Sequence, residues 1–316
     1  MIDFRYHLVS LIAVFLAVAL GIVIGTTQLN GPVLSNLQTQ VTALQHDKRS
    51  LEDTTQGLKA QVNTSDAFEQ AIAPALVKGT LTGRRVLLVI ANDQVAQDTV
   101  DQVTALVGKA GGTLTGSVRL QPEYSDPATE NALQSYVTGP GRPAGIELPT
   151  VNDTGKLVAS LLAQVLMVPA RGGATPSSAD ISTVLAGLSA LKVLSQESAS
   201  VTPADYAVVL TSGGFQGADA LARNTKLADL ASSLDAAGSG GVVAGDTGAA
   251  GKTGLIGVVR AAPTLSAAVS TVDNVDTAAG QISTVLALGP EGKGTSGKYG
   301  SGQDTQPVPP VPATTP

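Results

Sequence analysis

The chain has 316 residues, a formal net charge of −6 and charged side chains at only 14% of its positions, against about 25% in an average soluble domain. It contains no cysteine, which excludes disulfides and thiolate metal sites. Its net negative charge gives no indication of a basic surface that would bind nucleic acid. A chain of this length can bury one sizeable core besides a membrane anchor, so we expect a single large domain.

The first predicted element is an apolar helix at the N-terminus. Residues 8–25 carry no charge and one polar side chain, Ser10, and at about 1.5 Å per residue they would cross about 27 Å of a hydrocarbon core that is roughly 30 Å thick. A cleaved signal peptide is the alternative, because residues 17–19, Ala-Val-Ala, resemble a small-residue cleavage site. The apolar run continues beyond that site, so we predict an uncleaved transmembrane anchor over residues 1–26.

Charge on the two sides of this span predicts its orientation. Arg5 precedes the span, and no charged residue follows it until Asp47. Basic residues stay on the cytoplasmic side. We therefore predict a single-pass membrane protein with a cytoplasmic N-terminus and the bulk of the chain outside the cytoplasm, in the cell envelope.

The second predicted element is a coiled coil over residues 27–67. Apolar residues recur there at alternating spacings of three and four, a 3.5-residue repeat held for four heptads. Leucine fills every d position, and chains anchored in one membrane pair only in parallel, which predicts a parallel two-stranded coil. The predicted interface residues are Leu34, Leu37, Val41, Leu44, Leu51, Leu58 and Val62, with Lys48 and Thr55 at the remaining a positions.

The partner of this coil stays open at the level of sequence. In a homodimer Asp47 at g would face Glu52 at e of the second copy, and these like charges repel slightly. A homodimer and a hetero-partner are therefore both compatible with the pattern. A single amphipathic helix lying back on the domain is the other reading, since Gly57 weakens the helix by about 1 kcal/mol.

From residue 68 the pattern changes to alternating strand and helix signals. We predict a mainly parallel α/β sheet, covered by helices on both faces, over residues 68–293, and a disordered tail rich in Pro and Gly over residues 294–316. Residues 121–149 read as a loop. The expected strands are residues 85–91, 113–120, 206–211, 241–245 and 254–261, and the expected helices are residues 92–112, 153–167, 179–193 and 217–237.

Two motifs invite an enzymatic reading. Residues 245–254 approach a phosphate-binding loop, but Asp246 stands where its first glycine is required, so we interpret the segment as a turn between two strands. Both histidines precede the domain, which excludes a Ser-His-Asp nucleophile there. Asp273 and Asp276 are close enough in sequence to form a carboxylate pair, although capping and turn roles are favoured. We predict no enzymatic activity, no catalytic residues and no cofactor.

The order of segments along the chain resembles a known family. The opening residues 1–26, the heptads, the strand at residues 85–91, and residues 270–289 and 298–302 together resemble the actinobacterial MctB family, also called the copper transporter family, which includes SteB. The resemblance implies an envelope protein. One naming implies copper homeostasis or efflux through an outer-membrane channel, and another implies a scaffold for cell-wall and division machinery. It supplies no catalytic or metal-ligand residues for this chain.

Transport by this chain alone finds little support in its residues. A membrane barrel needs alternating strands and aromatic girdles, whereas this chain has four Phe, five Tyr and no Trp. Copper ligands are equally scarce, and we predict no protein-built metal site, because no two of Met1, Met167, His7 and His46 have metal-ligand spacing. We therefore expect a copper-homeostasis component, or alternatively a non-catalytic division scaffold, that acts by binding an envelope protein partner.

Overall fold

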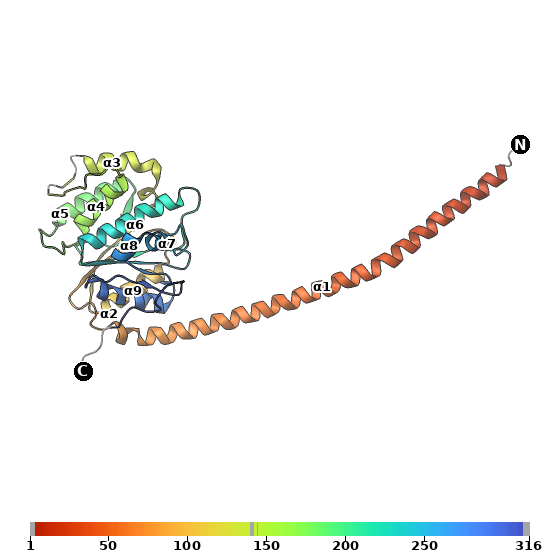
Figure 1. Cartoon of the computed structure of the whole chain (residues 1–316), viewed down its shortest axis with the longest axis horizontal. Helices are drawn as coiled ribbons and strands as arrows, with labels where there is room; N and C mark the ends of the chain where they lie inside the picture. The colour runs from red at the N-terminus through yellow and green to blue at the C-terminus, as the bar shows by residue number, and fades with distance from the viewer. Residues whose placement is uncertain (1–3, 140–141, 144, 312–316) are drawn as a thin grey trace. The chain divides into compact units, whose positions relative to one another are not determined.

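The computed structural model describes residues 4–139, 142–143 and 145–311, without the side chains of residues 26–34. The chain divides into two compact units, Met1–Ser65 and Asp66–Pro316. The first unit consists of one helix, and the second is an α/β domain (Figure 1).

Helix α1 runs from Phe4 to Val77 without interruption. The predicted anchor and the predicted heptads therefore lie on one continuous helix. Threonines along it are accommodated because their hydroxyls donate to carbonyls one turn earlier, for example Thr39 to Ser35 at 2.9 Å and Thr55 to Leu51 at 2.7 Å.

The α/β domain is built on a seven-stranded sheet with the order β3-β2-β1-β4-β5-β6-β7. Every neighbouring pair is parallel except β2 and β3, which are antiparallel. The predicted mainly parallel α/β architecture is thereby confirmed. The strands are β1 (Arg85–Ile90), β2 (Thr113–Leu120), β3 (Leu194–Gln196), β4 (Tyr206–Leu210), β5 (Gly240–Ala244), β6 (Ser270–Val272) and β7 (Lys298–Tyr299).

Helices cover both faces of this sheet (Figure 1). Helices α2 and α9 lie on one face, and α3 to α8 lie on the other. Two short 3-10 helices, Pro122–Tyr124 and Pro127–Thr129, precede α3. The helices are α2 (Gln97–Lys109), α3 (Glu130–Thr138), α4 (Thr154–Leu166), α5 (Ser178–Ala190), α6 (Ala220–Ala237), α7 (Leu255–Ala261), α8 (Pro263–Ala268) and α9 (Ala278–Glu291).

The sheet separates two apolar cores, because successive side chains of a strand point to opposite faces. Along β1, Leu87 and Val89 belong to the core under α3 to α8, whereas Val86, Leu88 and Ile90 belong to the core under α2 and α9. Central parallel strands buried on both faces are continuous apolar runs, which is why β1, β4 and β5 were recognisable from sequence. The end of α1 contributes Ala73 and Val77 to the α2/α9 core.

One predicted strand is wrong. Residues 254–261 were expected to form a strand, but Leu255–Ala261 is helix α7. Its buried side chains, Leu255, Ile256, Val258 and Val259, follow the spacing of one helix face. Gly257 allows the close approach, since a Cβ there would overlap the carbonyl oxygen of Gly251. A short apolar run cannot be assigned to strand or helix by periodicity alone.

Other elements fall where the sequence analysis placed none. Helix α3 lies inside the predicted loop over residues 121–149, with Leu133 and Val137 buried. Helix α9 was not predicted at all. Strand β7 lies in the tail that was predicted to be disordered, and it pairs with β6. Arg260 holds the strand through the Tyr299 carbonyl, and Asp273 holds the loop after it through the Ser301 N–H.

Candidate interaction surface

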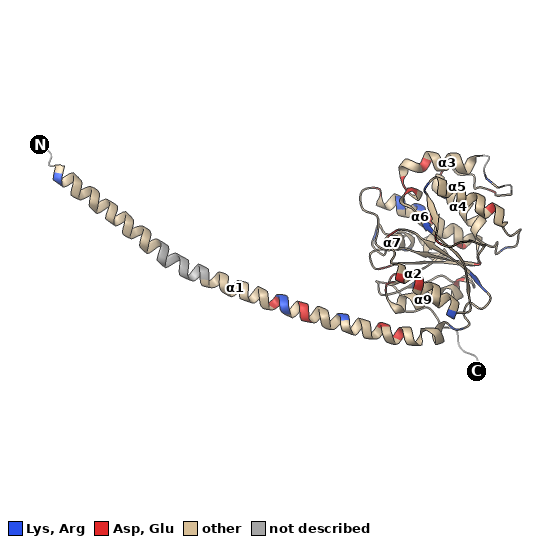
Figure 2. Cartoon of the chain, turned by 180° about the vertical axis from the view of Figure 1, so that it is seen from behind, with Lys and Arg blue, Asp and Glu red and all other residues tan. Residues whose placement is uncertain are grey.

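The N-terminal part of α1 is an exposed apolar segment. Residues Phe4–Gly25 have a mean hydropathy of 2.9 and none is buried. Figure 2 shows a basic position, in blue, at the start of the helix and neither blue nor red beyond it as far as the grey segment. By length and composition this is a helix that can cross a membrane.

The predicted heptad residues form an exposed apolar stripe on α1 beyond the span. Leu44 and Leu51 are 67% and 68% exposed, and Leu37 and Leu58 exceed half. The a positions Val41 and Val62 are exposed in the same way; the side chain of Leu34 lies outside those that the structure describes. Full burial of such a side chain is worth about 1.5–3 kcal/mol relative to leaving it exposed.

The middle of the stripe carries one ion pair and one shallow hollow. Lys48 at a pairs with Glu52 at e, with 3.5 Å between Nζ and Oε1. A shallow hollow on the helix surface lies among the d, g, a and e side chains around Leu51. The hollow is lined by Leu44, Asp47, Lys48, Leu51, Glu52, Thr55, Gln56 and Lys59.

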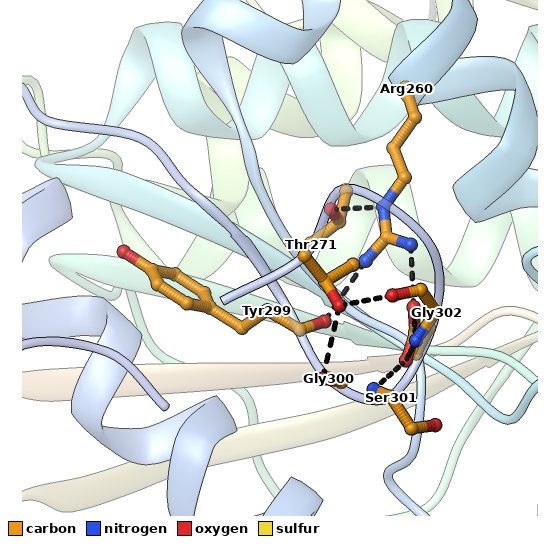
Figure 3. Close-up of polar contacts among 8 residues, drawn as sticks. Arg260, Thr271, Tyr299, Gly300, Ser301 and Gly302 are labelled. Atoms are coloured by element: carbon orange, nitrogen blue, oxygen red, sulfur yellow. Dashed lines mark hydrogen bonds and ion pairs between the residues drawn. The ribbon is translucent and has the colours of Figure 1, made fainter. Parts of the chain in front are cut away.

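A buried ion pair links two of the segments that carry the family resemblance. Asp273, at the end of β6, is 1% exposed and accepts from Nη1 of Arg260 on α7 at 2.6 Å. Arg260 also donates to Thr271 at 2.9 Å and to the carbonyl of Tyr299 at 3.0 Å (Figure 3). The guanidinium therefore connects α7, β6 and β7.

The same carboxylate holds the loop after β7. Asp273 accepts the backbone N–H of Ser301 at 2.8 Å and that of Gly302 at 3.2 Å. Gly300 has φ of +124°, and a Cβ there would overlap the Asp273 carboxylate. A glycine is therefore required at this position.

The two candidate carboxylates, Asp273 and Asp276, have different surroundings. The carboxylate of Asp273 accepts hydrogen bonds from Arg260 and Ser301, whereas Asp276 is exposed. The cap of α9 is Thr277, whose hydroxyl accepts from the Gly280 N–H. Arg260 was missed by the sequence analysis because its segment was read as a strand. A basic residue in the last turn of a helix is a recognisable signal, but it could be used only if residues 255–261 had been predicted to be a helix.

The glycine-rich loop over residues 245–254 connects β5 to α7, so its interpretation as a turn between two strands is wrong in its second half. Asp246 accepts the Ala249 N–H of this loop at 2.8 Å and the Gly213 N–H of the loop after β4 at 2.9 Å. Burial opposes the charge of Asp246, but hydrogen bonds from Ser212 and these amides outweigh it and hold the pKa of that carboxyl below its usual range. The Ala249 amide therefore already donates to a carboxylate of the loop itself.

The sulfur and imidazole groups that could bind copper differ in their surroundings. Met167 is 1% exposed and belongs to the core under α3 to α8, whereas His7 and His46 are exposed on α1. Met1 lies outside the described residues. Within residues 4–139, 142–143 and 145–311 there is no group of three His, Cys, Asp or Glu side chains that could hold a metal ion.

Comparison with known proteins gives one consistent family. Residues 1–310 match the family model described as "Copper transport outer membrane protein, MctB". The chain is 32% identical to "Copper transporter MctB" of Mycobacterium tuberculosis (strain ATCC 25618 / H37Rv) over 98% of this chain and 99% of that protein. It is 34% identical to the protein of the same name from Mycobacterium leprae (strain TN), over 96% of this chain and 97% of that one.

Proposed function

The chain belongs to the MctB family, and from that premise we propose that it is a single-pass envelope protein that contributes to copper homeostasis by assembling with a protein partner. In this proposal Phe4–Gly25 anchors the chain with its N-terminus in the cytoplasm. The stripe on α1 pairs in parallel with a second copy or with another envelope protein. Copper is affected through that assembly and is not coordinated by this chain.

The exposed stripe carries the assembly part of the proposal. Its d-position leucines are each more than half exposed on α1, and the repeat places them on one face. Four consecutive exposed leucines at d form a contiguous apolar surface, and such a surface on a protein marks an interaction site. The anchor holds any partner on the same membrane in parallel register.

The ligand inventory supports an indirect role in copper handling. Soft Cu(I) prefers thiolate and thioether sulfur, and the sulfur that the structure describes is Met167, enclosed in a core. His46 projects from the f position of the repeat, which points away from a coiled-coil partner. Pairing of two chains would therefore bring their His46 side chains no closer to a shared site.

A division scaffold is the alternative that the stripe also supports, since both functions use a partner surface and neither needs catalysis. The two differ in what they affect. A copper function predicts that loss of the stripe changes copper accumulation at constant cell separation. A scaffold function predicts the reverse.

A complementation experiment tests the proposed function in cells. A strain lacking the protein would be complemented with the wild-type chain, with Leu44→Asp/Leu51→Asp, or with His7→Ala/His46→Ala. We expect the leucine variant to leave cells loaded with copper and the histidine variant to restore normal copper content. Normal copper content with the leucine variant, together with chained or unseparated cells, would favour the scaffold.

A titration tests whether the chain handles copper directly. Purified full-length protein would be titrated with Cu(I) and Cu(II) by calorimetry, and its conductance measured in planar bilayers. We expect neither stoichiometric binding at submicromolar affinity nor reproducible channels. Either result would restore direct transport as the activity.

A further inference from the structure

The segment that follows β7 folds back along the edge of the sheet. Tyr299 of β7 forms a parallel bridge with Gln306. The Gly300 N–H donates to the Gln306 carbonyl at 2.9 Å, and the Gln306 N–H donates to the Lys298 carbonyl at 2.8 Å. The C-terminal segment is therefore fixed to the domain at its beginning, although residues 294–316 were predicted to be disordered.

Beyond Gln306 the segment is rich in proline. Residues 307–311 read Pro-Val-Pro-Pro-Val, and Pro312 follows in the sequence. Proline fixes its own φ at about −65° and forces the residue before it into an extended conformation. Each of the five residues is a proline or precedes one, and none lies in a helix or strand or has a positive φ. These restrictions favour the polyproline II helix, which has about three residues per turn.

The exposure of the segment follows that period. Val308 and Val311 are three residues apart and are each 47% exposed. Pro307 and Pro310, also three apart, are exposed, whereas Pro309 is buried. Because residues three apart lie on one edge of a polyproline II helix, one edge rests on the domain. The other two edges, one of valine and one of proline, face outward as apolar ridges.

The chemistry of these ridges restricts what can bind them. Residues 305–316 carry no charged side chain, so no side-chain ion pair selects the partner. Pairing with a partner's β-strand is also disfavoured, because proline has no N–H to donate to a ladder. What the segment offers is carbonyl acceptors between apolar ridges. Tyrosine and tryptophan match both, since their flat rings fit between the ridges while the O–H or indole N–H donates to a carbonyl.

We propose that residues 307–311 are a preformed docking segment for a second protein whose surface has a groove lined by tyrosine and tryptophan side chains. Attachment through Gln306 and Pro309 holds the segment in its binding conformation, which lowers the entropy lost on association. The proposal does not depend on the stripe on α1, because the two belong to different units of the chain.

Photocrosslinking of the full-length chain in intact cells tests the proposal. The photoreactive amino acid p-benzoylphenylalanine would replace Val308 or, as a control, Val151, an exposed valine elsewhere on the domain. We expect position 308, and not position 151, to crosslink to another protein at a site lined by tyrosine and tryptophan, as mapped by mass spectrometry. In isolated membranes a polyproline peptide should suppress this product, and a Gly-Ser peptide of equal length should not.

Variants carrying the crosslinker at position 308 assign the contact to the proline ridge. Pro307→Ala/Pro310→Ala should lower the yield of the product about tenfold, through lost ring contacts and a less restricted backbone. Pro149→Ala, at another exposed proline, should not change the yield. Leu44→Asp/Leu51→Asp should also leave it unchanged, which separates this contact from the assembly proposed above.

Four results would overturn the proposal. They are the absence of a product from position 308, a product with a second copy of this chain, a contact site without aromatic side chains, and a yield that the polyproline peptide does not change. Each would leave residues 307–311 as a cover for the edge of the sheet and nothing more.

Discussion

Glu291 is a carboxyl group enclosed at the end of α9. It is 4% exposed, and its Oε1 accepts the Ser270 N–H at 2.6 Å. Burial, together with the nearby charge of Asp235, raises the pKa of Glu291 to about 7, and burial raises the pKa of Asp235 to about 6. Both groups are therefore more easily protonated in the folded protein than in the unfolded chain.

This pKa shift predicts that the free energy of unfolding falls as pH rises. Between the ordinary value of 4.5 for Glu291 and about 7, the folded state binds more protons than the unfolded state, so stability is complete below this window and lost across it. A shift of this size corresponds to about 3 kcal/mol. Urea unfolding followed by tyrosine fluorescence, at about pH 5 and about pH 8, measures the difference.

Glu291→Gln keeps an acceptor for Ser270 but cannot be charged. We expect the variant to lose most of the pH dependence and to be more stable than wild type at the higher pH, with a smaller slope left by Asp235. Glu147→Gln, at an exposed position, should retain the full wild-type slope. An unchanged slope in Glu291→Gln would contradict the assignment of this pKa to Glu291.

The buried ion pair of Asp273 with Arg260 predicts that substitution of Asp273 lowers the free energy of unfolding. Asp273→Asn would leave the Arg260 guanidinium buried without its partner, and loss of one member of a buried pair costs about 3–5 kcal/mol. We expect unfolding to become easier by that amount and amide hydrogen exchange in residues 298–302 to accelerate. Asp276→Asn, at an exposed neighbour, should change stability by less than about 0.5 kcal/mol. Equal effects of the two variants would show that the ion pair contributes nothing.

At the scale of elements, the stripe on α1 should pair through its leucines. Leu44→Asp/Leu51→Asp places charges in the seam, where desolvating them costs far more than pairing gains. Since both leucines are more than two-thirds exposed on α1, the change should dissociate the coil without unfolding the helix. Sedimentation velocity of the detergent-solubilised chain should report a dimer for wild type and a monomer for the variant.

The matched control adds the same charges on another face of the helix. Ala43→Asp/Ser50→Asp occupies c positions, which point away from a coiled-coil partner, so this variant should sediment as a dimer. A monomeric wild-type chain would rule out the homodimer. Capture of an envelope protein by wild type, lost in the leucine variant, would then identify a hetero-partner.

The elements that the sequence predicted are those whose signal is local. Strand β1, for example, is a continuous apolar run buried on both faces. Strands β6 and β7 are too short to show a sequence pattern. Strand β7 is held by Arg260, which pairs with Asp273 only in the folded chain.

At the scale of the whole molecule, cleavage or retention of the N-terminal segment decides whether the α/β domain stays attached to the membrane. Cleavage after Ala19 would cut inside the continuous helix α1 and leave Leu20, Ile22 and Ile24 as an exposed apolar end. Retention keeps Phe4–Gly25 as one span, with Arg5 on the cytoplasmic side. We therefore predict that the mature chain keeps its N-terminus and that this end is inside the cell.

The absence of cysteine from the whole sequence allows both parts of that prediction to be measured at once. Phe4→Cys and Ser182→Cys each introduce one thiol, at the first residue of the Phe4–Gly25 segment and on the exposed side of α5. A membrane-impermeant maleimide added to intact spheroplasts should label Ser182→Cys and leave Phe4→Cys unlabelled, while lysis should make Phe4→Cys reactive, with the cysteine-free wild type as a blank. Labelling of Phe4→Cys before lysis would reverse the orientation. A mature Phe4→Cys chain that stays unlabelled after lysis has lost its first residues, because cleavage after Ala19 removes the thiol together with the anchor.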